Sequence, residues 1–186
     1  MKNSLGGLVA ILVGSATIVA LLNIQNPVFS WPYNSVWLIF SGSSALIATL
    51  GNILNPELII GYILTWIIIG LIIAPFSKKG WNTLRTSLWA GLFLGIFSLV
   101  TLLLENPNFW ILPTRNLQLV YHFLTSIIVT LLALPSAIPV TMIKERIMKH
   151  AEEPIPDKIE TSCECGAVFK SNPLICSECG RQLREP

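Results

Sequence analysis

The chain has 186 residues, of which 53% are hydrophobic and only 12% are charged, and its mean hydropathy is +0.67. Soluble domains carry about 25% charged residues, so this composition predicts that lipid surrounds most of the chain. The formal net charge of +2 does not indicate the concentrated basic surface that a nucleic-acid-binding protein needs, so we do not expect nucleic acid as a partner.

The charges divide the sequence into two parts. Seven charged residues lie between Met1 and Ile143, whereas fifteen lie in the last 43 residues. This break predicts a membrane domain at residues 1–143, a charged linker at 144–161 and a small C-terminal domain at 162–186.

Five apolar stretches of the membrane domain have the length of a bilayer crossing, which takes about 20 helical residues. Backbone groups in lipid must pair within the segment, and these stretches lack the alternation of a β-barrel strand. We therefore expect an all-α polytopic membrane protein with about five transmembrane helices. The predicted spans are Leu5–Ile24, Val36–Leu54, Leu58–Phe76, Thr86–Leu104 and Leu117–Ile143.

The first span has the basic start of a secretory signal, because Lys2 precedes it. A signal peptide has an apolar core of about 7–15 residues, and this run is longer and has no A-x-A-like cleavage site after it. We expect a retained span. Three spans end at an Asn-Pro pair, in which Asn tolerates the left-handed helix end and Pro stops the helix. The pairs are Asn26-Pro27, Asn55-Pro56 and Asn106-Pro107.

Short loops rich in Lys and Arg face the cytosol. Two basic segments are separated by two predicted spans, so both can be cytosolic. With five spans the N-terminus then lies outside, which leaves Lys2 as an exception. The alternative makes residues 36–76 a re-entrant hairpin with one true crossing and places Lys2 inside. The basic residues of the two segments are Lys78, Lys79, Arg85, Lys144, Arg146 and Lys149.

Small residues recur at every fourth position in two of the spans. Gly6, Ala10 and Gly14 form one such stripe, and Gly91 and Gly95 form another. Stripes of this kind let helix backbones approach closely in lipid. They predict packing within this chain or against a partner subunit.

Ionisable groups within the predicted spans are few. Glu57 and Glu105 lie at span ends, and His122 lies one turn into the last span. Such groups are functional candidates in a membrane, but at these depths they also fit interfacial polar residues. The polar run Ser41–Ser44 has no accompanying base that would activate a serine nucleophile. The sequence therefore predicts no enzyme activity.

Two prolines, Pro135 and Pro139, lie four residues apart in the last span. Each removes a backbone hydrogen bond and clashes with the preceding turn, so we expect a kink there. Such a kink serves either as a hinge or to fit the helix into a bundle.

Two pairs of cysteines near the C-terminus carry the strongest signal, and a glycine follows the second cysteine of each pair. Structural zinc takes four tetrahedral ligands, and two thiolates from each of two short turns supply them. No position is then open for catalysis, so we expect one structural Zn²⁺. The alternative is a pair of disulfides, which a reducing cytosol disfavours. The predicted ligands are Cys163, Cys165, Cys176 and Cys179.

The cysteine pairs resemble the knuckles of a short zinc ribbon over residues 162–183, with the forms CxCG and CxxCG. The first knuckle departs from the usual CxxC spacing by one residue. Between the pairs, residues 167–170 and 174–175 can form a β-hairpin around residues 171–173. A segment this small needs metal binding to supply its folding free energy.

These features favour a non-enzymatic integral protein of the cell membrane, whose cytosolic zinc ribbon makes it an adaptor or assembly subunit that docks a partner. The partner would bind through the ribbon or through the membrane helices, and the bilayer surrounds the rest. The paired prolines and polar positions such as Asn23, Asn52 and Thr65 favour instead a transporter or channel component. In that alternative the ribbon is a regulatory or assembly module.

Overall fold

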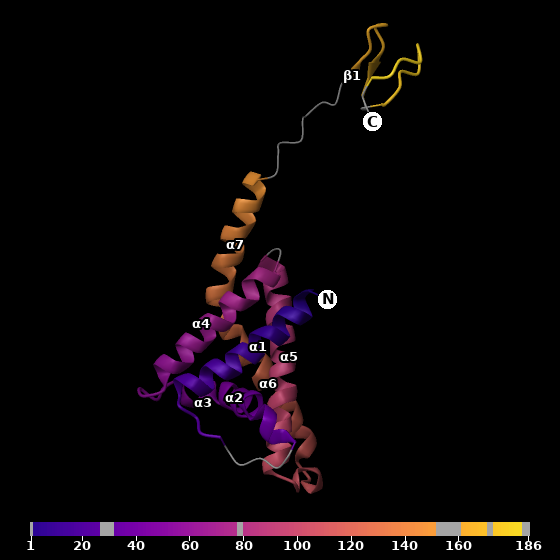
Figure 1. Cartoon of the computed structure of the whole chain (residues 1–186). Helices are drawn as coiled ribbons and strands as arrows, with labels where there is room; N and C mark the ends of the chain where they lie inside the picture. Colours follow the sequence, from indigo (N-terminus) through magenta and orange to yellow (C-terminus); the bar gives the residue numbers. More distant parts are fainter. Residues whose placement is uncertain (1, 27–31, 78–79, 152–160, 171–172, 184–186) are drawn as a thin grey trace. The chain divides into compact units, whose positions relative to one another are not determined.

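The chain consists of two compact units, Met1–Met148 (the bundle) and Lys149–Pro186 (the C-terminal unit), each of which is described by itself (Figure 1). The computed structural model describes residues 2–26, 32–77, 80–151, 161–170 and 173–183. Lys78 and Lys79, residues 152–160 of the predicted linker and residues 171–172 of the predicted hairpin turn lie outside the described residues.

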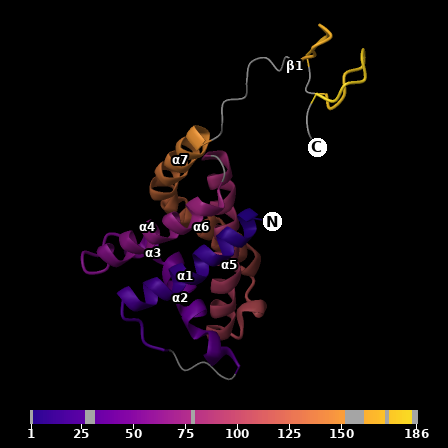
Figure 2. The same cartoon turned by 45° about the horizontal axis from the view of Figure 1, so that its top comes forward.

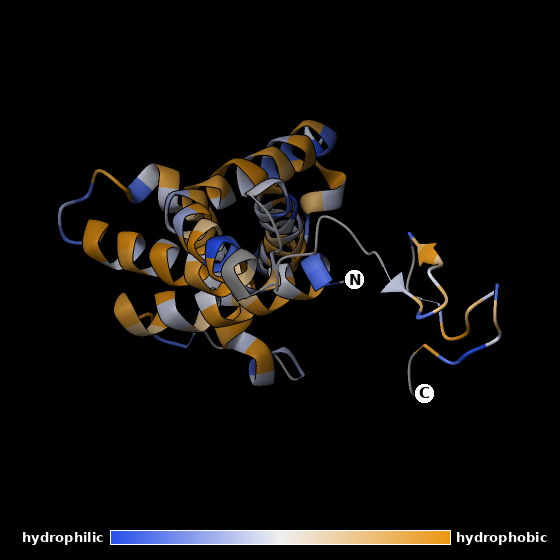
Figure 3. Cartoon of the chain, turned by 90° about the horizontal axis from the view of Figure 1, so that it is seen from above, coloured by the Kyte–Doolittle hydropathy of each residue, from blue (hydrophilic) through white to orange (hydrophobic). Residues whose placement is uncertain are grey.

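Among the described residues, four helical stretches of the bundle are long and apolar enough to cross a membrane. They correspond to four of the five predicted spans and support a membrane protein. Many of their Leu, Ile and Trp side chains are exposed. Hydrophobic residues make up most of the helical ribbon in Figure 3. The four stretches are α1 (Lys2–Leu21), α4 (Ile59–Phe76), α5 (Gly80–Glu105) and Arg115–Met148.

The fourth stretch is interrupted close to the paired prolines. It consists of α6 (Arg115–Thr130), a single 3-10 turn η3 (Leu131–Ala133) and α7 (Leu134–Ala151). Pro135 is the second residue of α7, and Pro139 lies further inside that helix. Proline has no backbone N–H group to donate, so the two prolines predict an interruption at this point. Helix α7 continues to Ala151, so the first part of the predicted linker is helical.

Residues 36–54, the second predicted span, do not form one long helix. The short turn η1 (Tyr33–Val36) leads into α2 (Trp37–Ile47), and after Ala48 the short helix α3 (Thr49–Asn52) follows. Neither helix has the roughly 20 residues of a bilayer crossing.

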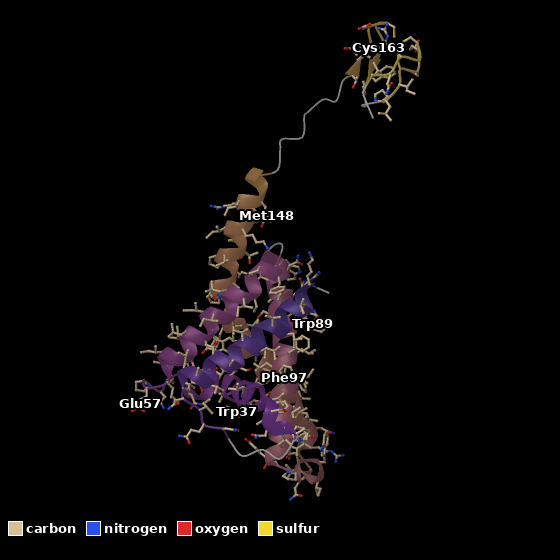
Figure 4. All side chains as sticks on the ribbon, in the orientation of Figure 1. Trp37, Glu57, Trp89, Phe97, Met148 and Cys163 are labelled. Carbon is tan, nitrogen blue, oxygen red and sulfur yellow. The ribbon has the colours of Figure 1, made fainter. Side chains whose placement is uncertain are left out.

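Helices α2 and α3 instead form a hairpin that enters and leaves at one end of the bundle. Near its entry, Thr101 in the last two turns of α5 donates a 2.9 Å hydrogen bond to Phe40 O. Near its exit, Asn52 Nδ2 lies 3.4 Å from Tyr62 Oη, in the first turn of α4. Figure 4 shows Trp37, the first residue of the hairpin, and Glu57, which follows it, at the same end of the bundle.

The deepest part of this hairpin lies near the middle of the long helices. Leu46 lies beside Gly14, about halfway along α1. The hydroxyl of Thr49 donates to Leu46 O at 2.6 Å and accepts a 3.1 Å hydrogen bond from Trp66 Nε1. This path differs from the expected second crossing and has the form of the re-entrant alternative.

The start of α1 lies at the same end of the bundle as the α4–α5 connection, as Figures 1 and 2 both show. A side chain at Gly6 would collide with Phe76, the last residue of α4. Lys144 Nζ donates a 2.7 Å hydrogen bond to Pro75 O, so α7 reaches this end too. The start of α1 thus shares one end of the bundle with Pro75 and Lys144, as in the re-entrant alternative, whereas five crossings would place it at the other end. The side of the membrane on which this end lies stays a prediction.

The small-residue stripes pack inside this chain. Gly14 lies against Ile69 of α4. A Cβ atom at Gly95 would stand 2.7 Å from a ring carbon of Phe123 on α6, closer than such atoms approach in proteins. Each glycine therefore permits a close helix crossing that any larger residue would push apart.

Hydroxyl groups rather than charges link the helices inside the bundle. Ser87 on α5 donates a 2.8 Å hydrogen bond to Thr130 O, and Thr83 donates a 3.2 Å bond to Thr141 on α7. All four residues are fully or almost fully buried. Between helices in lipid, such bonds and close packing replace the hydrophobic effect as the source of association.

Helix α1 ends earlier than the predicted Asn26-Pro27 signal. Asn23 has φ 51°, in the left-handed region, and Ile24 N–H bonds to Val19 O at 3.0 Å. This arrangement is a Schellman helix end with asparagine at the left-handed position. The predicted mechanism is present, but Asn23 performs it in place of Asn26.

Candidate metal centre

The first cysteine pair lies in a tight turn between two short strands of the C-terminal unit. Strand β1 (Thr161–Ser162) pairs antiparallel with β2 (Val168–Phe169). The turn is closed by two 2.9 Å hydrogen bonds, from Cys163 N to Ala167 O and from Gly166 N to Cys163 O. Gly166 has φ 92°, which glycine adopts without steric cost. The glycine after the cysteine pair is thus required by the turn.

The second pair lies in a turn of the same construction. Cys176 N donates to Arg181 O at 2.8 Å, and Gly180 N donates to Cys176 O at 2.9 Å, with Gly180 at φ 71°. An antiparallel bridge between Ile175 and Gln182 closes its base. Each cysteine turn therefore has its own strand pair. The expected hairpin between residues 167–170 and 174–175 is corrected, because β2 pairs with β1.

The four predicted ligands converge. Their sulfur atoms all lie within 4.8 Å of one another, with Cys163 Sγ 3.5 Å from Cys179 Sγ and Cys165 Sγ 3.6 Å from Cys176 Sγ. A tetrahedral site with metal–sulfur bonds of about 2.3 Å has sulfur–sulfur edges of about 3.8 Å. A disulfide would bring two sulfurs to about 2.05 Å, and all four cysteines are free. The group could therefore hold one metal ion with four thiolate ligands.

Backbone N–H groups in the turns point at the sulfur atoms. Desolvation raises the pKa of Cys176, but hydrogen bonds from the backbone of Cys179 and Glu178 outweigh it and lower that pKa to about 7. Backbone groups of Ala167 and Arg181 likewise act to lower the pKa of Cys165 and Cys179, but hydrogen bonds with neighbouring thiols outweigh them and raise the pKa of both, that of Cys179 to about 12. The backbone donors therefore favour the thiolate, the form that binds a metal, most clearly at Cys176.

Little else holds the C-terminal unit together. Among its described residues only Cys163 and Cys176 are buried. The two turns are joined by an ion pair between Glu164 and Arg181, both of which are exposed. Exposed ion pairs contribute little to stability. The donor set thus fits a metal ion whose binding would supply the folding free energy of the unit.

Three apolar side chains of the C-terminal unit point into solvent. Val168 on β2 is 63% exposed, and Leu174 and Ile175, before the second turn, are 56% and 60% exposed. They contribute nothing to a core within the unit. These side chains are therefore accessible to another molecule.

A second group of polar side chains lies in the bundle, beside the α2–α3 hairpin. His122 on α6 and Ser98 on α5 contact each other, with 2.9 Å between Nε2 and Oγ. They line a cavity of about 280 Å³ together with Ser44 on α2 and Glu105 at the end of α5. The structure thus brings two of the three ionisable candidates, Glu105 and His122, to one place, whereas Glu57 does not line this cavity.

The direction of these hydrogen bonds argues against a nucleophilic serine. His122 Nε2 also lies 3.2 Å from Gly95 O, and a carbonyl oxygen only accepts, so Nε2 carries the proton. The hydroxyl of Ser98 donates to Leu94 O at 2.6 Å. Activation of a serine needs the opposite direction, from the hydroxyl to the imidazole. No spacing in the sequence links residue 98 with residue 122, so only the fold could reveal this contact.

Comparisons of the chain with protein-family models, curated proteins and solved structures found no match.

Proposed function

We propose that the chain is a membrane-embedded adaptor or assembly subunit, whose C-terminal zinc ribbon docks a partner protein in the cytosol. The observation that carries the proposal is the pairing of a closed four-thiolate site with the exposed apolar side chains of Val168, Leu174 and Ile175. A metal with four protein ligands has no position for substrate, so its role is structural. The unit it folds then presents a contact surface.

Zinc is the metal that best fits this donor set. Four thiolates in a tetrahedral arrangement suit Zn²⁺ or an iron–sulfur centre, and closed four-cysteine sites in small turns are common structural zinc sites. One zinc ion per chain is expected, with ligands Cys163, Cys165, Cys176 and Cys179. Metal analysis of the purified chain tests this, and bound iron in place of zinc would contradict it.

The cytosolic face is the end of the bundle that carries the start of α1 and the end of α7. Lys2, Arg85 and Lys144 belong to this end, and Lys78 and Lys79 lie in its α4–α5 connection. With four crossings and a re-entrant α2–α3 hairpin, all of these cations satisfy the positive-inside rule, and Lys2 is no longer an exception. Tags at the two chain ends should be reached by protease from the same side of the membrane; protection of one tag alone would favour five crossings.

Partner docking is tested in the full chain in its native membrane. Val168→Asp together with Leu174→Asp should remove the co-purifying partner without loss of zinc, because the change affects the exposed surface and no ligand. Glu178→Gln, on an exposed polar position of the second turn, is the matched control and should keep the partner. A chain that purifies alone, or an unchanged partner in the double variant, would contradict the proposal.

The alternative, a transporter or channel component, has support from one observation. The polar cavity beside His122 lies at a re-entrant hairpin, and irregular backbone at membrane depth is tolerated where it is buried in protein or lines a water-filled space. Ion or solute flux into liposomes that His122→Phe abolishes would favour this alternative. If the unchanged protein shows no flux, the transporter or channel alternative is excluded.

A further inference from the structure

The cytosolic end of the bundle contains a second cavity, between α1 and α5, of about 490 Å³. The start of α1 contributes Lys2, Asn3 and Ser4 to its lining. Helix α5 contributes one stripe of exposed side chains, at positions i, i+3, i+4 and i+7, which lie on one helix face. These residues are Arg85, Leu88, Trp89 and Leu92.

The polarity of this cavity changes along the helix axis. Arg85 and Lys2 lie at its outer part, whereas Leu92 lies two turns further along α5, about 10 Å deeper. Trp89, which is 44% exposed, lies between them, as interfacial tryptophans do. A cation pair above an apolar wall matches the two parts of a phospholipid, the charged headgroup and the acyl chain.

The two cations share the cavity without a counter-ion from the lining, which contains no acidic side chain. The bundle has three acidic residues, Glu57, Glu105 and Glu145, and none of them lines this cavity. Glu57 follows α3 and Glu105 ends α5, both at the opposite end of the bundle, where Figure 4 labels Glu57, and Glu145 lies on α7. Two positive groups at one low-dielectric surface repel each other unless an anion lies between them.

Close packing of α1 on α5 brings the two cations together. A Cβ atom at Gly7 would stand 2.7 Å from Ala90 N and 3.0 Å from a side-chain atom of Trp89. The glycine therefore lets α1 lie directly against the backbone of α5, one turn beyond Lys2. The first turn of α1 also has unpaired N–H groups, which add positive potential at this point.

We propose that this cavity binds one anionic phospholipid of the cytosolic leaflet. Lys2 and Arg85 contact the phosphate, while Leu88 and Leu92 contact an acyl chain. A phospholipid is the occupant because the apolar wall continues into the lipid-facing surface of α5, where free phosphate would leave it uncovered. This proposal does not depend on the partner-docking function, because no residue of the C-terminal unit takes part.

The test uses the full chain in neutral detergent and native mass spectrometry during titration with phosphatidylglycerol, phosphatidylcholine or inorganic phosphate. The unchanged protein should retain one phosphatidylglycerol in preference to phosphatidylcholine. Lys2→Gln and Arg85→Gln should each weaken this binding roughly fivefold, the effect of about one interfacial cation. Leu92→Trp should weaken it as well, because the larger side chain fills the apolar part while both charges remain.

Arg146→Gln on α7 is the matched control. It removes a cation that lies at the same end of the bundle but does not line the cavity. It should leave the first phosphatidylglycerol in place. Equal weakening by Arg146→Gln and Arg85→Gln would mean a diffuse surface charge and would overturn the site. Phosphate alone competing as well as the lipid, or unchanged binding in Leu92→Trp, would overturn the phospholipid as occupant.

Discussion

In the bundle the buried interior is rich in Ser, Thr and Gly and the exposed surface is rich in Leu and Ile, whereas in the C-terminal unit the buried side chains among the described residues are two cysteines. The first pattern is stable only where lipid covers the apolar surface. The second pattern is stable only where an interaction other than apolar burial holds the two cysteine turns together. We therefore expect each unit to depend on a component other than the polypeptide, lipid in one case and metal in the other.

The comparison predicts that the two units fail independently. Cys176→Ser should abolish metal binding and the fold of the C-terminal unit while leaving the helices intact, because the lost ligand is one of the two buried side chains among the described residues of that unit. Metal content of the purified chain should fall from about one ion to none, and the segment after residue 161 should become sensitive to protease. Ser177→Ala, beside the ligand, is the control and should retain the metal. A metal-bound Cys176→Ser protein would show that the site is assigned wrongly.

The second prediction destabilises the bundle and leaves the C-terminal unit unchanged. It concerns the contact between the α2–α3 hairpin and α1. Gly42 lies against the backbone of Ser15, and any Cβ atom there would collide with it. Gly42→Leu should lower the stability of the bundle by about 3 kcal/mol, the upper range for overpacking, and leave metal content unchanged. Thermal unfolding in detergent measures the effect.

Gly51→Leu provides the matched control, since a Cβ at Gly51 meets nothing within 4 Å. It should leave the melting temperature within experimental error. Equal melting temperatures for Gly42→Leu and Gly51→Leu would mean that the hairpin does not pack against α1 at Gly42.

The comparison also explains what the sequence could reveal. The metal ligands were predictable because tetrahedral coordination requires four donors from short turns, and the spacing of Cys163, Cys165, Cys176 and Cys179 supplies them with no reference to distant residues. The strand pairing could not be predicted from the sequence. The segments on either side of a cysteine turn could pair with each other or with the segments beside the other turn. The structure selects the former through β1 and β2.

In the bundle, hydropathy predicted the long helices but not the break at Ala48. Residues 36–54 are apolar enough on average to cross a membrane, and no proline marks the interruption. Directly after the break, Thr49 accepts a hydrogen bond from Trp66, 17 residues further along the chain. Average hydropathy contains no information on such tertiary hydrogen bonds, and the same limit hid the contact between Ser98 and His122.

A smaller effect is expected where hydroxyl groups link the helices. Ser87→Ala removes a 2.8 Å hydrogen bond from α5 to Thr130 O at the end of α6. Interhelical bonds of this kind contribute about 0.6 kcal/mol, because the helices find other partners when they separate. The melting temperature should fall slightly. Thr17→Ala, which removes an exposed bond within α1 to Val13 O, should cause no measurable change.

The smallest effect concerns the ion pair that joins the two cysteine turns. If metal binding rather than contacts between side chains holds the C-terminal unit together, Arg181→Gln should reduce its stability by about 0.5 kcal/mol or less, since Arg181 and Glu164 are both largely exposed. Metal affinity measured by competition with a chelator should then change less than about threefold, and high salt should remove the difference. A tenfold loss would mean that the pair, and not the metal alone, determines how the two turns meet. In that case the contrast between a lipid-dependent bundle and a metal-dependent unit would be incomplete, because the second unit would have a polar core of its own.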